Sequence, residues 1–174
     1  MSSELGFDTW QSTSGVNQTT SVQVVNYNYT STWSASGSGT SWYDTPLLAT
    51  ITPSKTTSKI LVIAKMFLGT QYWEIQGRLT RNGTVIGIGD TRGSRMQCGF
   101  ATLKYDQSYD YYDWFPVSYT YYDAPNTVSP VTYRIQLNPY GGNVIYMNRK
   151  HSWADNNDRD GCPSSTITLM EISQ

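Results

Sequence analysis

Six aspartates in two short polar segments are the residues whose type and spacing come closest to a catalytic arrangement. They are Asp106, Asp110, Asp113, Asp155, Asp158 and Asp160. Carboxylate pairs cleave glycosidic bonds, one acting as an acid and the other as a base or nucleophile. Both segments also have the composition of turns, where Asp is favoured because its side chain bonds to the nearby backbone. We interpret all six as turn residues and expect a non-enzymatic protein without a catalytic residue or cofactor.

The single histidine and a possible calcium loop give no stronger signal. To act as a catalytic base, His151 would need a nucleophile within hydrogen-bond reach. Ser and Thr are so frequent in this chain that a pairing of His151 with one of them, inferred from the sequence, would have no significance. His151 has no second histidine or paired cysteines for zinc. Residues 156–161 match the first half of a calcium loop, but Ile167 occupies the position of the closing glutamate. We therefore expect no metal site.

Residues 105–125 hold seven tyrosines and four aspartates in twenty-one positions. The first part has no periodicity, which predicts a loop, and rigid aromatic rings in a loop are effective contact surfaces. This possible contact loop consists of Tyr109, Tyr111, Tyr112 and Trp114. Ligand binding and packing on a neighbouring subunit both remain open for it. In the second part, alternation predicts that Phe115, Val117, Tyr119 and Tyr121 are structural.

The first twenty residues are polar apart from Leu5, Phe7 and Trp10, which disordered tails usually lack. We expect an extended arm whose three apolar residues dock either on a partner or back onto their own domain. The N-terminus also lacks the charged and apolar regions of a signal peptide. Cys98 and Cys162 are therefore expected to be free thiols.

The elements that position these residues are predicted to be strands. The chain has 174 residues, only 14% of them charged, and it is rich in Tyr, Trp and β-branched residues, a composition that favours one all-β domain over residues 21–174. A net charge of −1 provides no basic surface for nucleic acid. No window has the roughly 18 apolar residues of a membrane helix, so membrane insertion is not expected.

Short periodic runs separated by turn residues predict nine or ten strands, as in a sandwich or jelly roll. We predict strands at 22–29, 42–53, 58–69, 95–103, 114–122, 131–137, 143–149 and 165–172, plus a hairpin at 72–90. Asn82 and Gly83 supply the type I′ turn of that hairpin. A phase shift at Val24 and Val25 predicts a bulge, and 31–41 reads as a loop. The apolar run 58–69 predicts a strand buried on both faces.

Five segments, taken in order, resemble a family of virion-surface modules frequent in marine and cyanobacterial phages. They are "LLATITPSKTTSKILVIAKMFLG", "RLTRNGTVIGIGD", "YYDAPNTVSPVTYRIQL", "NVIYMNR" and "SSTITLMEI". The resemblance covers roughly residues 22–172. It implies a trimeric jelly roll like that of the C1q and tumour-necrosis-factor group, found at tail-fibre ends or as a small stand-alone virion protein.

A fibre tip normally follows an attachment domain and a long shaft, whereas about twenty residues precede the first predicted strand here. Extended, such an arm reaches at most about 65–70 Å. We therefore favour a capsid decoration (cement) protein, assembled into the virion in the host cytoplasm, whose Leu5, Phe7 and Trp10 bind other virion proteins. The alternative is a short tail-fibre or spike tip that recognises host surface glycan.

Overall fold

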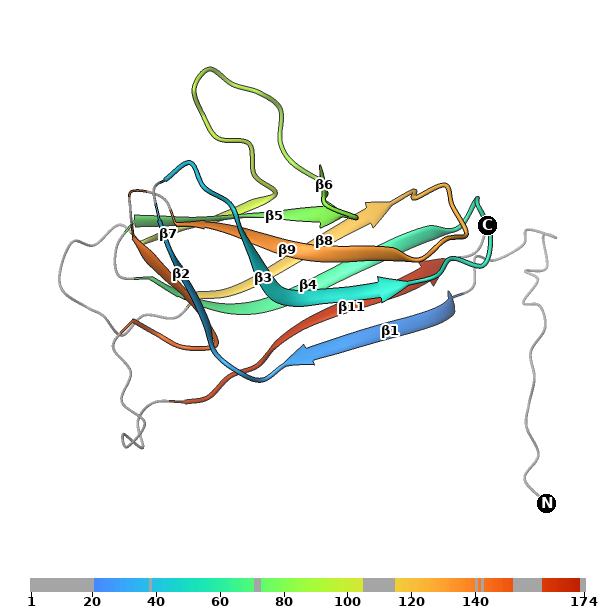
Figure 1. The fold of residues 1–174 in the computed structure, drawn as a ribbon, viewed down its shortest axis with the longest axis horizontal. Coiled ribbons are helices and arrows are strands. Elements are labelled where there is room, and N and C mark those ends of the chain that lie inside the picture. The colour runs from blue at the N-terminus through green and yellow to red at the C-terminus, as the bar shows by residue number, and fades with distance from the viewer. Residues whose placement is uncertain are drawn as a thin grey trace, which may run out of the picture.

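Two antiparallel β-sheets packed face to face make up the part of the chain that the computed structural model describes (Figure 1). That part comprises residues 21–37, 39–70, 73–104, 115–139, 141, 143–151 and 161–172. Its eleven strands are β1 (Ser21–Tyr29), β2 (Trp33–Ser36), β3 (Tyr43–Ile51), β4 (Lys59–Thr70), β5 (Trp73–Arg81), β6 (Thr84–Ile86), β7 (Phe100–Lys104), β8 (Phe115–Asp123), β9 (Val131–Pro139), β10 (Val144–Met147) and β11 (Ser165–Ile172). The predicted all-β class and the packing of two sheets are confirmed.

The first sheet is organised around β4, which is paired along both edges. One edge pairs with β11 and, over its last residues, with β10, while the other edge pairs with β8. β1 extends the sheet beyond β11, and β2 extends it beyond β10. In the second sheet the order is β3, β9 and β5, and β6 and β7 share the remaining edge of β5.

Alternation along the strands directs one face of each sheet into a common core. The largest fully buried side chains are Tyr133, Leu47, Ile51, Ile60, Met66, Leu68, Ile75, Leu79, Ile135, Leu137, Ile145 and Met147. They come from both sheets, so that neither sheet can bury its apolar face without the other.

The hairpin predicted from its turn residues is present. Asn82 and Gly83 have φ of 48° and 82°, as a type I′ turn requires, and they join β5 to β6. The second strand is shorter than predicted and ends at Ile86. Gly87 then adopts φ of 63°, and its carbonyl accepts a hydrogen bond from the Tyr119 hydroxyl at 2.7 Å. A Cβ at Gly87 would lie 2.3 Å from that oxygen, so only glycine fits this bend.

Three local predictions are wrong. The predicted loop 31–41 contains β2, which forms because its residues pair with β10, far along the chain. In the predicted strand 95–103, pairing with β5 begins only at Phe100. The register between β1 and β11 is regular through Val24 and Val25, and its irregularity lies earlier, between Ser21 and Gln23.

The prediction that β4 is buried on both faces is also wrong. Inward-facing Ile60, Val62 and Met66 are fully buried. Ile63 on the opposite face is 36% exposed, because the second sheet covers only the inner side of β4. The described part of the chain therefore leaves an apolar strand face open.

A buried polar cluster joins the two sheets at one end of the sandwich. Asp123, at the end of β8, accepts hydrogen bonds from Arg81 Nη1 at 3.0 Å to each carboxylate oxygen and from the Tyr133 hydroxyl at 2.6 Å. Arg81 and Tyr133 face each other across β5 and β9. Burial and the adjacent carboxylate raise the pKa of Tyr133, so that its hydroxyl keeps the proton that it donates.

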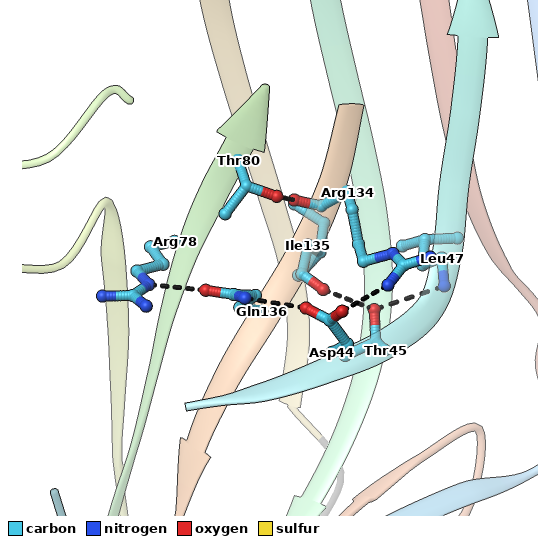
Figure 2. A network of polar contacts seen from close by, with 8 residues as sticks. All are labelled: Asp44, Thr45, Leu47, Arg78, Thr80, Arg134, Ile135 and Gln136. Atoms are coloured by element: carbon cyan, nitrogen blue, oxygen red, sulfur yellow. Dashed lines mark hydrogen bonds and ion pairs between the residues drawn. The ribbon is translucent and has the colours of Figure 1, made fainter. Parts of the chain in front are cut away.

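A bulge interrupts β3 at Pro46, which has no N–H to give to the ladder. The hydroxyl of buried Thr45 compensates for the interruption (Figure 2). It donates to the Ile135 carbonyl at 2.7 Å and accepts from the Leu47 N–H at 3.2 Å. One side chain thus satisfies two buried backbone groups that the regular ladder would otherwise pair.

We predict that Thr45→Val lowers the free energy of unfolding by about 1–3 kcal/mol, because the isosteric change leaves both backbone groups without a partner. Urea unfolding followed by tryptophan fluorescence measures this. Thr50→Val, at an exposed position of the same strand, is the matched control and should change stability much less. Equal effects of the two substitutions would contradict the role given to Thr45.

Candidate functional site

The side chains predicted to form the anchor and the contact loop lie outside the described residues. The anchor residues are Leu5, Phe7 and Trp10, and the loop residues are Tyr109, Tyr111, Tyr112 and Trp114. The six turn aspartates and most of the 156–161 segment also lie outside the described ranges. The roles assigned to these residues therefore stay predictions.

The structure does describe the second half of the tyrosine-rich stretch and confirms its structural role. Val117 and Tyr119 are buried in the core, and Phe115 and Tyr121 pack against it. The ring of Tyr119 also contacts that of Phe100, with centroids 5.4 Å apart. Burial raises the pKa of Tyr119 to about 12, so this hydroxyl stays protonated at neutral pH.

His151 lies against aromatic and cationic side chains. Its Nδ1 is 3.0 Å from the Tyr146 hydroxyl, and the guanidinium of Arg149 stacks on the Tyr146 ring at 4.6 Å.

Cys98 and Cys162 are both free thiols. Within the described ranges, no three His, Cys, Asp or Glu side chains come together as metal ligands would. No helix in that part of the chain has the length and apolarity to cross a membrane.

A line of apolar side chains crosses the outer face of the first sheet. Directly opposite residues of neighbouring strands point to the same face, and pairing aligns one such residue from each of four strands. The four, here called the apolar row, are Val24 (β1), Met170 (β11), Leu61 (β4) and Tyr122 (β8). Val24 is 57% exposed and Tyr122 is 50% exposed. Removal of such a surface from water would favour association.

Ile63 extends the apolar row along β4, with polar side chains on either side of it in the register. Its cross-strand neighbours are Thr168 and Thr120. Beyond it, the ammonium of Lys65 lies 5.4 Å from the centre of the Phe67 ring. The outer face thus has an apolar centre with a polar and cationic border, the composition expected of a protein contact.

The outer face of the second sheet has a different chemistry, a chain of polar contacts across its three main strands (Figure 2). Arg78 Nε donates to Gln136 Oε1 at 2.8 Å, and Gln136 Nε2 donates to Asp44 Oδ1 at 2.7 Å. Arg134 forms an ion pair with the other Asp44 oxygen. The hydrogen bond from Gln136, together with Arg134, lowers the pKa of Asp44 despite some desolvation, so the carboxylate is ionised at neutral pH.

Two hollows open on this second face. One, of about 320 Å³, is lined by Asp44, Thr80, Asn82, Gly83, Thr132, Arg134 and Gln136. The other, of about 820 Å³, is lined by Gly39, Thr40, Glu74, Gln76, Ser94, Arg95, Met96, Cys98 and Gly141. Much of this second lining comes from the 87–99 segment between β6 and β7, which rises away from the sheet (Figure 1). Polar side chains dominate the lining of the smaller hollow, and the larger one has a mixed lining that includes Glu74, Gln76 and Arg95.

Glu171 is fully buried where β11 ends, and hydrogen bonds hold its carboxylate in place. Ser54 donates through its N–H at 2.7 Å and its hydroxyl at 2.6 Å, and Gln23 Nε2 donates at 2.7 Å. Burial raises the pKa of Glu171, but these hydrogen bonds outweigh burial and lower the pKa to about 2. The carboxylate thereby ties β1 and the turn after β3 to the end of β11.

No family model matches the chain, and no curated protein matches it in sequence. The resemblance to phage virion-surface modules therefore remains a prediction.

We predict that Glu171 makes the protein sensitive to acid. Its folded-state pKa of about 2 lies below the ordinary 4.5, so its contribution is complete above pH 4.5 and is lost as pH falls toward 2. A loss of roughly 2–3 kcal/mol in unfolding free energy is expected over this range. Denaturant unfolding at a series of pH values measures it.

Two variants isolate the contribution of Glu171. Glu171→Gln should be less stable at pH 7 and flatter between pH 4.5 and 2, because the titrating group is gone. Ser54→Ala removes one hydroxyl donor but keeps the backbone donor, so its stability should begin to fall at a higher pH than in the wild type. Parallel pH profiles for all three proteins would show that acid acts elsewhere.

Proposed function

We propose that this chain is a non-enzymatic virion structural protein of a bacteriophage, a trimeric capsid decoration (cement) protein that its N-terminal arm attaches to other virion proteins. The apolar row on the first sheet carries the proposal. Four strands contribute aligned apolar side chains to a face that no described residue covers. Contact with further copies of the chain would bury this face, as the function of a lattice-reinforcing protein requires.

The strand order supports the jelly-roll topology that belongs to this proposal. From β3 to β5 the chain alternates between the sheets, and from β7 to β11 it crosses between them repeatedly. In each sheet an early strand lies beside a late one, β1 beside β11 and β3 beside β9. Such neighbours joined by long connections are characteristic of Greek keys and jelly rolls. In this scheme β2 and β10 form an added pair at the edge.

The positions where the undescribed segments leave the sandwich support attachment by one end. Ser21 pairs with Ile172, which in turn pairs with Lys59 at the start of β4. Phe115, which follows the predicted contact loop, pairs with Leu68 near the other end of β4. The arm and the loop therefore depart from opposite ends, about 30 Å apart for a strand of this length. A module anchored at one end presents the other outward.

We predict that Val24→Lys dissociates the trimer, because a lysine in the apolar row would have to be desolvated on association. Light scattering coupled to size-exclusion chromatography of the purified protein measures the mass directly. Val128→Lys is the matched control, since Val128 is 51% exposed but lies in the turn between β8 and β9, outside the row. This variant should keep the trimeric mass. A wild-type monomer, or equal dissociation by both substitutions, would refute self-association through the row.

We predict that Ala substitution of Leu5, Phe7 and Trp10 together lowers incorporation into virions by roughly tenfold or more, because their burial contributes about 25 cal/mol per Å². Copies per particle are counted by quantitative mass spectrometry of purified virions.

A second triple variant, Ala at the polar positions Ser3, Thr9 and Ser12, is the control and should incorporate normally. Unchanged incorporation of the apolar triple variant would contradict anchoring by the arm. Imaging of labelled particles then locates the protein on the virion. Copies on the head lattice would support decoration, whereas copies at the tail would support the role of a fibre tip.

A further inference from the structure

Arg78 is the arginine on the polar face that is held rigidly while keeping most of its donors available. Its guanidinium stacks on the indole of Trp42 at 4.1 Å, and its Nε is bonded to Gln136, which Asp44 holds in turn. Stacking and one anchored nitrogen fix the plane of the group. Among the described residues no hydrogen bond is made by its two terminal nitrogens.

The other described arginines of comparable setting use their terminal donors within the chain. Arg81 Nη1 bonds to Asp123, and Arg134 Nη1 bonds to Asp44. Arg149 also stacks on an aromatic ring, but its Nε and Nη2 donate to the backbone carbonyls of Lys150 and His151, both at 3.3 Å. Arg78 therefore differs in presenting an unoccupied pair of parallel donors, which is the arrangement that binds a planar anion with two hydrogen bonds.

The surroundings of Arg78 select a singly charged anion. Asp44 and Glu74 lie on the same face as Arg78, and Asp44 already pairs with Arg134. These two carboxylates would repel a doubly charged phosphate or sulfate more strongly than a singly charged carboxylate. Burial lowers the pKa of Arg78 against the opposing effect of Asp44, which reflects a partly dehydrated group whose hydrogen bonds are strengthened.

The hollows on either side of Arg78 are suited to hydroxyl groups. Gln76, Arg78 and Thr80 point to the same face of β5, so the 820 Å³ hollow lies toward Gln76 and the 320 Å³ hollow toward Thr80. Gln76 lines the larger hollow and donates through its Nε2 to Glu74 at 2.9 Å. Carboxylate, amide and hydroxyl side chains occur in the linings of both hollows, and such groups form hydrogen bonds with the O–H groups of a sugar.

We propose that this face, from Glu74 to Thr80 along β5, is a binding site for an acidic saccharide. The carboxylate of a uronic acid unit lies on the two terminal nitrogens of Arg78, and the flanking sugar units place their hydroxyls over the two hollows. The site lies on the sheet opposite to the apolar row, so it does not depend on trimer formation or on attachment to a capsid.

The test uses the full-length protein and isothermal titration calorimetry with a tetrasaccharide of galacturonic acid. Maltotetraose, which is neutral, tests the need for the carboxylate, and a tetra-aspartate peptide tests the need for a sugar. Inorganic phosphate tests the preference for a singly charged anion. The expected result is binding of the uronic tetrasaccharide that is at least tenfold tighter than binding of any of the other three.

Arg78→Lys keeps the charge but removes the paired donors and should weaken binding of the uronic tetrasaccharide at least tenfold. Arg149→Lys is the control, because Arg149 is also stacked on an aromatic ring but donates to backbone carbonyls of the chain. This variant should bind the uronic tetrasaccharide as tightly as the wild type does. Trp42→Phe, a smaller stacking surface, should fall between them. The mass and melting temperature of each variant are measured on the same samples, so that a loss of binding without a change in either is attributed to the site.

Equal binding by wild type and Arg78→Lys would overturn the proposal, as would an undetectable affinity for the uronic tetrasaccharide. Equal or tighter binding of the peptide would assign the face to an acidic protein partner, and preference for phosphate would remove the carboxylate specificity. None of these results would bear on self-association, which is measured separately through the apolar row.

Discussion

The strand β4 sets the constraint on which the rest of the structure depends. Its side chains alternate between two faces, and both faces carry apolar residues, whereas the described part of the chain supplies one further sheet, which covers only the inner face. The inner residues, such as Val62 and Met66, are enclosed by the second sheet and form the centre of the core. The outer residues Leu61 and Ile63 lie on the face that we propose to bind another copy of the chain. In that proposal the same strand takes part in both folding and association.

Three buried polar groups lie where the regular pairing of strands fails or ends. Thr45 bonds the backbone at a bulge, Asp123 joins the ends of strands from the two sheets, and Glu171 binds a turn to the end of β11. Each has its oxygens satisfied by specific donors or acceptors, which is what makes a buried polar group tolerable. A slip of two residues would keep the apolar alternation of a strand, and these specific bonds favour the observed register over such a slip.

Local patterns predicted the elements that neighbouring residues determine. Asn82 and Gly83 specify a turn by their own φ preferences, and the alternation from Phe115 to Tyr121 is set by the strand period. The strand at Trp33 could not be predicted, because only pairing with β10, more than a hundred residues later, makes it a strand. For the same reason the apolar row and the contact between Trp42 and Arg78 were missed. Each needs the register of strands that are distant in sequence.

Ser21 and Phe115, the described residues that adjoin the arm and the tyrosine-rich loop, lie toward opposite ends of β4, and in the proposed assembly this position affects the strength of attachment. In a threefold assembly built on the open face of the first sheet, symmetry places all three arms at the same pole. In that proposed assembly, once one arm is bound the other two would be held at a high effective concentration near their sites, so that three individually weak contacts would give a strong avidity. Each contact with the particle would then be reversible on its own while the assembly as a whole stayed attached.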